Sequence, residues 1–227
     1  RFFGEGGSFD SYRSTFSSQG QLGILQYGIE LGRFETENDT FSTLPRHDYE
    51  QDQASLALQW RARGDVMLKF SYRGSENQLG TTSISPPFIS YSDIETKTHL
   101  VAFNAEYKVN PDWQSKLTLG YYDESYLGNF DGSFGSSIFG TDFDRLTVNW
   151  NQQIQLNEQF ELLTGLEYSD SNFKNSSGRQ TDYHTAGVYL HGNWKPIDGF
   201  LIEGGVRYDE HSEFDGDTAW DFGGAYD

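Results

Sequence analysis

The 227-residue chain contains no cysteine, which excludes a disulfide framework and any metal site built on thiolates. Basic residues are scarce as well: 16 lysines and arginines stand against 34 aspartates and glutamates, giving a net charge of −18. Because binding to phosphate groups needs cationic side chains, this balance argues against nucleic acid as a partner. The composition therefore points away from thiolate metal sites and from nucleic-acid-binding domains.

Long apolar runs are also missing. No segment approaches the roughly 18 consecutive apolar residues that a membrane-spanning helix requires. A strand of a membrane β-barrel needs only about 9–11 residues, and half of these can be polar. The sequence therefore excludes helical membrane spans and leaves a transmembrane barrel open.

Apolar residues alternate with polar ones along much of the chain, as in segments 54–60 and 66–72. A period of two predicts strands with one apolar face. Successive alternating runs end in aromatic residues of two series, namely Trp60, Tyr107, Trp150 and Trp194, and then Tyr72, Tyr121, Tyr168 and Tyr208. If consecutive strands are antiparallel, the two series form aromatic rows at opposite rims of an apolar band. Such rows are typical of the two water–lipid interfaces of a membrane barrel.

The connections between these runs alternate in length. Short, turn-forming links follow Trp60, Tyr107, Ile154 and Trp194, whereas longer polar segments cover roughly 36–51, 75–95, 124–141 and 171–181. Short turns on one side and long loops on the other are typical of outer-membrane barrels, in which the long loops lie outside the cell. We therefore predict an all-β, antiparallel, up-and-down barrel domain of about twelve strands over residues 1–227.

The positions that alternate with the apolar set carry charges of both signs. A side-chain period of two sends them to the opposite face of each strand, where we predict an interior that is either wet or lined by a polar plug. The residues predicted to face this lumen are Glu30, Lys69, Arg73, Glu106, Lys116, Glu161, Glu167, Glu203 and Arg207.

Two groups of residues are candidates for binding. Asp48, Glu50 and Asp52 occupy alternate positions, so they either form part of a solvated rim or ligate calcium; apart from this calcium, the sequence indicates no cofactor. Aromatic residues in the predicted loops form either a ligand-capture surface or loop packing; they are Phe88, Tyr91, Phe130, Phe134 and Phe139. No nucleophile–base pair stands out, so we do not expect an enzyme.

Several stretches resemble a known family. Segment 4–13 is similar to the first barrel hairpin of TonB-dependent outer-membrane receptors, especially those of the vitamin B12 (cobalamin) type. Segments 182–193 and 200–212, the latter with its Gly-Gly-Val-Arg-Tyr-Asp run, resemble a mid-barrel hairpin, and segment 220–226 resembles the strand that follows. The resemblance covers essentially the whole chain, but only about half of a family barrel of about 22 strands.

The resemblance implies a fragment without the plug domain and without the closing strands. It implies a receptor in the bacterial outer membrane that contacts lipid and the TonB protein, the latter through the plug. Its ligand would be a metal chelate, either cobalamin or a siderophore. In cobalamin-type receptors, acidic residues just before the fourth strand bind calcium, and Glu50 and Asp52 stand at that place.

Two other classes remain open at this point. One is a passive porin of about twelve strands, or a barrel enzyme, complete in itself. Such a barrel should begin with a signal peptide and usually ends on an aromatic residue, whereas this chain begins at Arg1 and ends at Asp227. The other is a soluble β-sandwich or adhesin, which would alternate in the same way but has no reason to place aromatic residues at both rims.

Overall fold

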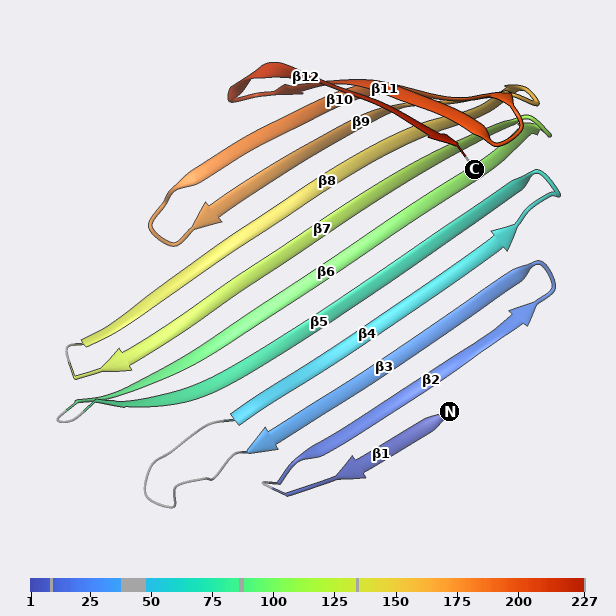
Figure 1. Cartoon of the computed structure of the whole chain (residues 1–227). Helices are drawn as coiled ribbons and strands as arrows, with labels where there is room; N and C mark the ends of the chain where they lie inside the picture. The colour runs from blue at the N-terminus through green and yellow to red at the C-terminus, as the bar shows by residue number, and fades with distance from the viewer. Residues whose placement is uncertain (9, 38–47, 86–87, 134, 227) are drawn as a thin grey trace.

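The computed structural model describes residues 1–8, 10–37, 48–85, 88–133 and 135–226. They form one antiparallel sheet whose strands follow each other in chain order (Figure 1). The strands are β1 (Phe2–Gly6), β2 (Tyr12–Leu22), β3 (Leu25–Glu37), β4 (Asp48–Arg61), β5 (Val66–Ser85), β6 (Phe88–Asn110), β7 (Trp113–Gly132), β8 (Gly135–Asn157), β9 (Phe160–Asn175), β10 (Gln180–Ile197), β11 (Phe200–His211) and β12 (Phe214–Tyr226). The predicted all-β, up-and-down class is confirmed. Within the described residues there is no helix long and apolar enough to cross a membrane.

The strand register follows the apolar alternation. Leu56 lies opposite Tyr72, and Leu58 lies opposite Phe70. Because cross-strand partners share a face, the alternating runs of all strands combine into one surface, which we call the apolar face. The opposite surface, which carries Lys69, is the polar face. A shift of one residue would mix the two surfaces, so the alternation itself specifies the register.

Within the described residues, no second layer of protein covers the apolar face. No apolar side chain among the described residues is buried, and Leu166, Val188 and Trp220 are 50%, 46% and 79% exposed. A water-soluble domain covers such a surface with a second layer of structure. The apolar face of this protein therefore lies against a non-aqueous medium or against further protein.

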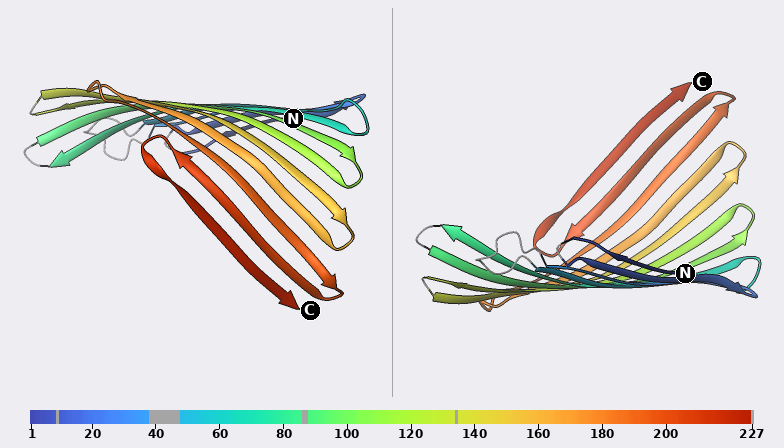
Figure 2. Two further views of the ribbon diagram at one scale, coloured as in Figure 1. Left: turned by 90° about the horizontal axis from the view of Figure 1, so that it is seen from above. Right: turned by 90° about the horizontal axis from the view of Figure 1, so that it is seen from below.

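The sheet is open and curved. β1 and β12 form its two edges, and β10–β12 turn away from the plane of the earlier strands (Figure 2). Along most of β10, apolar-face positions are exposed and polar-face positions are half-buried. Side chains converge on the concave side of a curved sheet and diverge on its convex side. The polar face is therefore the concave one.

The strands extend well beyond the predicted apolar runs. Segments 75–95 and 124–141, predicted as loops, consist largely of paired strand in β5–β8, and β4 starts at Asp48. Residues 38–47 of another predicted loop lie outside the described residues. The backbone hydrogen bonds of these hairpins continue where neither face needs to be apolar. The period-two signal then disappears although the strand does not.

The sheet has two ends. The turn end carries the connections β2–β3, β4–β5, β6–β7, β8–β9 and β10–β11, and the loop end carries the others. Tyr72 and Tyr121 both lie opposite Val101, on either side of it. These two residues, which were predicted to belong to one aromatic row, therefore lie at the same level of the sheet. Trp150 lies opposite Leu117, on a cross-strand row that continues through Ala105 and Leu68 to Trp60, another member of its predicted series. The heights of the two aromatic series along a barrel axis stay a prediction.

Candidate functional site

The nine residues predicted to face a lumen all lie on the polar face. Glu30 lies opposite Ser55, which lies opposite Arg73, and Glu106 lies opposite Lys116. The charges partly neutralise each other across strands: the Lys69 Nζ donates to Glu106 Oε1 at 2.8 Å. Whether this face lines a closed lumen stays a prediction.

Arg207 is the centre of the largest network on the polar face. Its guanidinium donates to Asp209 at 2.6 and 2.7 Å and pairs with Glu167 at 2.5 Å. It also lies 5.9 Å from the ring centroid of Tyr189, a cation–π contact. Asn149 donates to Glu167 at 3.2 Å, which extends the network to β8. The network ties β8, β9, β10 and β11 together where the sheet curves.

A second cluster lies nearer the loop end of the polar face, around Arg145 on β8. Its Nε donates to Ser171 Oγ at 2.9 Å, and its Nη2 donates to the Tyr183 hydroxyl at 3.0 Å. The guanidinium carbon lies 5.3 Å from the centroid of the Phe143 ring. Ser171 is fully buried, so its hydroxyl group holds the Arg145 side chain in a fixed position. Sequence reasoning did not select Arg145, although it lies out of phase with the apolar positions that follow it.

The aromatic candidates are not a loop surface, because the described ones belong to strands. Phe88, Phe130 and Phe139 lie on the polar face of β6, β7 and β8, whereas Tyr91 lies on the other face. Phe134 lies outside the described residues. The location in loops was wrong for the same reason that the strands were predicted too short. A capture role for these residues stays a prediction.

Two of the three acidic candidates for calcium form ion pairs with an arginine. Arg33 on β3 pairs with Glu50 at 2.6 Å and with Asp52 at 3.1 Å. The negative charge of Asp52 and a hydrogen bond with Glu35 raise the pKa of Arg33. Asp48 also has interactions of its own. Across the described parts of the chain, no group of three or more acidic or histidine side chains has the arrangement to hold a metal ion.

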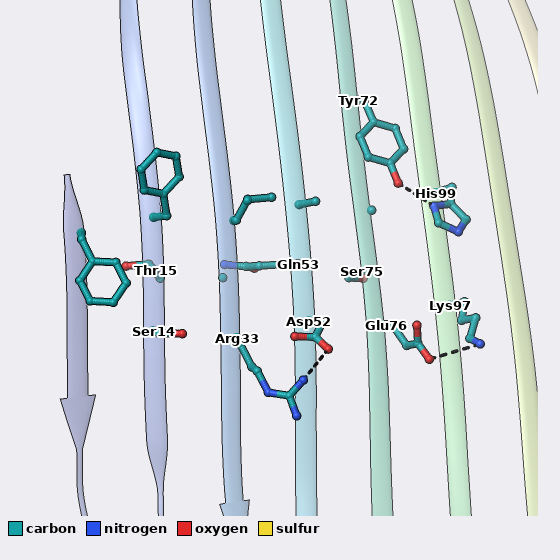
Figure 3. A pocket seen from close by; sticks show the side chains of 16 residues that line it. Ser14, Thr15, Arg33, Asp52, Gln53, Tyr72, Ser75, Glu76, Lys97 and His99 are labelled. Carbon is teal, nitrogen blue, oxygen red and sulfur yellow. Dashed lines mark hydrogen bonds and ion pairs between the residues drawn. The ribbon is translucent and has the colours of Figure 1, made fainter.

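Arg33 belongs to a charged row on the apolar face, just beyond Tyr72 towards the loop end. Asp52 lies opposite Glu76, and Glu76 lies opposite Lys97, with an ion pair of 3.2 Å between the last two (Figure 3). A hydrogen bond from Lys97 lowers the pKa of Glu95. A shallow hollow of about 440 Å³ lies next to the row, lined in part by Leu31, Ala54 and Gly74. The change from apolar to charged at this level is typical of a lipid–water interface.

The comparisons with known proteins agree with this geometry. The family model "TonB dependent receptor-like, beta-barrel" matches residues 33–227. No curated protein sequence matches the chain. Among solved structures, the siderophore receptor PirA from Pseudomonas aeruginosa is similar with a TM-score of 0.74 at 16% identity, covering 96% of this chain and 37% of that protein.

Two further receptors show the same fold. The ferric yersiniabactin uptake receptor FyuA from Yersinia pestis gives a TM-score of 0.71 at 16% identity, covering 96% of this chain and 41% of that one. A mutant of the ferric enterobactin receptor PfeA from Pseudomonas aeruginosa gives 0.73 at 14% identity, covering 98% and 40%. The chain thus spans about two-fifths of these receptors. The described residues form twelve antiparallel strands, and the family model matches most of the sequence, so the chain belongs to the TonB-dependent receptor family and forms part of its β-barrel.

Proposed function

We propose that the chain is part of the wall of a bacterial outer-membrane receptor that takes up a metal chelate with energy from TonB. One observation carries the proposal: the two faces of a single sheet suit two different solvents. The apolar face is exposed and ends in tyrosines and ion pairs, as a lipid-facing surface does. The concave face carries hydrogen-bonded charges of both signs, which suit water or a polar plug.

For the ligand, we propose a ferric siderophore in preference to cobalamin. The printed names of PirA, FyuA and PfeA connect similar barrels with siderophores or their ferric complexes. Sequence identities of 14–16% show only that the fold is shared, so the ligand remains a proposal for this chain. Cobalamin, which the sequence resemblance suggested, is the comparison ligand in the test.

The test is uptake by cells whose only such receptor is the full-length protein. We expect ferric siderophore to accumulate in cells that have TonB and to stop accumulating when TonB is deleted. Accumulation of small solutes that is independent of TonB would support the passive porin instead. Cobalamin accumulation in the absence of ferric siderophore accumulation would overturn the proposed ligand and leave the transport mechanism intact.

Calcium binding by Asp48, Glu50 and Asp52 is a separate proposal, for the loop end of the barrel. Arg33 already neutralises two of the three carboxylates, so calcium must compete with its guanidinium. We therefore expect Arg33→Gln to raise calcium affinity, because oxygen ligands are released without loss of a carboxylate. Titration calorimetry of the full-length receptor with calcium measures this affinity. The control is Asp52→Asn, which removes a ligand. Unchanged or weaker calcium binding in Arg33→Gln would contradict calcium binding at this site.

A further inference from the structure

The shallow hollow on the apolar face, just beyond Tyr72 towards the loop end, has a floor of small side chains (Figure 3). Ala54 on β4 and Gly74 on β5 lie opposite each other there, so the larger side chains of the face are interrupted. The same cross-strand row continues through Leu31 to Phe16, which line one side of the hollow. With a volume of about 440 Å³, the hollow can take up part of an apolar chain.

A charged row borders the hollow on the side of the loop end. It runs from β3 to β6 and consists of Arg33, Asp52, Glu76 and Lys97. Its charges are therefore ordered positive, negative, negative and positive. Arg33 pairs with Asp52 at 3.1 Å, and Lys97 pairs with Glu76 at 3.2 Å. The side chains of Asp52 and Glu76 are still 50% and 44% exposed, so both carboxylates can accept further hydrogen bonds.

The two central residues of the row carry the same charge. Asp52 and Glu76 lie directly opposite each other on neighbouring strands. Like charges in this arrangement repel and destabilise the strand pair. A cation between the two carboxylates would remove this repulsion.

Negative charge is also in excess around the row. Within the described residues, its ion pairs join Arg33 to Glu35, Glu50 and Asp52, and Lys97 to Glu76 and Glu95. Five carboxylates against two cations leave a surplus of three negative charges. The row therefore attracts a cationic group and repels an anionic one.

The hollow and the surplus charge lie side by side, so an occupant that fits both has an apolar chain and a cationic head. Glu76 lies four residues beyond Tyr72 on β5, which is about 13 Å along the strand. At this level the apolar face becomes charged, as the surface of a membrane barrel does among lipid headgroups. A bare metal ion would match the charge of the row but would make no use of the hollow.

We propose that the hollow binds an ethanolamine phospholipid of the surrounding bilayer. One acyl chain lies over Leu31 and Ala54, and the ammonium group lies between the carboxylates of Asp52 and Glu76. An ammonium group has three N–H donors, so it can form charge-assisted hydrogen bonds to both carboxylates at once. The phosphate of the same headgroup lies near one of the two flanking cations. The zwitterionic headgroup thus matches the order of charges along the row.

The proposal goes beyond the uptake of a chelate, because it concerns the outer surface of the wall. It rests on one part of the proposed function, the contact of the apolar face with lipid. A choline headgroup has the same charges as ethanolamine but no N–H donor on its nitrogen, and a glycerol headgroup has no cation. Phospholipids with these two headgroups therefore separate recognition of the ammonium group from binding of an acyl chain or a phosphate.

The experiment measures binding of the ethanolamine, choline and glycerol phospholipids, with identical acyl chains, to the full-length receptor in detergent. Native mass spectrometry gives the affinities, and a chelator removes divalent cations. We expect the receptor to bind the ethanolamine lipid about tenfold more tightly than the other two, the lower end of what a hydrogen bond to a charged group contributes. Glu76→Gln should reduce this preference to about threefold or less, because it removes one of the two charges that hold the ammonium group.

Two variants serve as controls. Asp142→Asn removes a carboxylate from the apolar face of β8 on the same cross-strand row, two strands beyond Lys97 and away from the hollow. It should leave all three affinities unchanged. Ala54→Leu fills the floor of the hollow and should weaken binding of all three lipids by similar factors, because they share the acyl chain.

Three results would overturn the proposal: equal affinity of wild type for the ethanolamine and choline lipids, an unchanged preference in Glu76→Gln, or binding of none of the lipids. Tightest binding of the glycerol lipid would overturn it as well, because Arg33 and Lys97 would then recognise a phosphate. Failure of the transport function is seen separately, in the assay of TonB-dependent uptake, and would leave these lipid affinities as they are.

Discussion

Replacing Leu117 with arginine is expected to lower the free energy of unfolding of the full-length receptor by about 2–4 kcal/mol. Leu117 lies on the apolar face of β7, opposite Ala105 on one side and Trp150 on the other. It is midway between the levels of Trp113 and Tyr121, so an arginine there would be placed near the middle of the membrane. Urea unfolding in lipid vesicles, followed by tryptophan fluorescence, measures the change.

Thr118 provides a matched control on the same strand. Its side chain lies on the polar face and donates to Asn104 Oδ1 at 2.8 Å. Thr118→Arg adds the same charge one residue away, where water or a polar plug can solvate it. We expect it to cost about 1 kcal/mol or less, chiefly the lost hydrogen bond. Equal losses for the two variants would mean that the faces do not differ in their surroundings.

The 227-residue chain by itself is expected to self-associate. β1 pairs only with β2, and β12 pairs only with β11, so each has an edge without a backbone partner among the described residues. Exposed strand edges recruit other strands, and the apolar side chains on β12, such as Phe222 at 75% exposure, add to the tendency. Light scattering during size-exclusion chromatography in detergent should show association that rises with concentration.

The full-length receptor is the control for this experiment, because further strands can pair with both edges there. We expect its apparent mass in the same detergent to be independent of concentration. A monodisperse monomer of the 227-residue chain, with amide protons of β1 and β12 protected from exchange, would contradict the expectation. It would show that the two edges pair with each other and would favour a self-contained barrel of twelve strands.

The hairpins and their register were predictable because one face is apolar. Wherever the chain alternates, as in β4 and β5, only one pairing places Leu56 beside Tyr72 and Leu58 beside Phe70. The extent of β5–β8 was not predictable in the same way. Near the loop end, strand pairing is maintained by backbone hydrogen bonds and carries no apolar period.

The faces of the charged residues followed from the alternation, but their partners did not. Nine charges were predicted on one face from a period of two within single strands. The Arg33 ion pairs with Glu50 and Asp52 depend on the pairing of β3 with β4 across residues 38–47. Sites of this kind become visible only once the register is known.

Single cysteines introduced at positions 115–121 of β7 test the central claim, that the two faces of this sheet meet different solvents. The chain has no cysteine, so each introduced thiol can be labelled with an environment-sensitive fluorophore in the full-length receptor, freed of any other cysteine. In vesicles, we predict blue-shifted emission and quenching by lipid-attached quenchers at 115, 117, 119 and 121. Positions 116, 118 and 120 should instead be quenched by a small water-soluble quencher. Emission without a period of two, or with the two sets exchanged, would contradict the account.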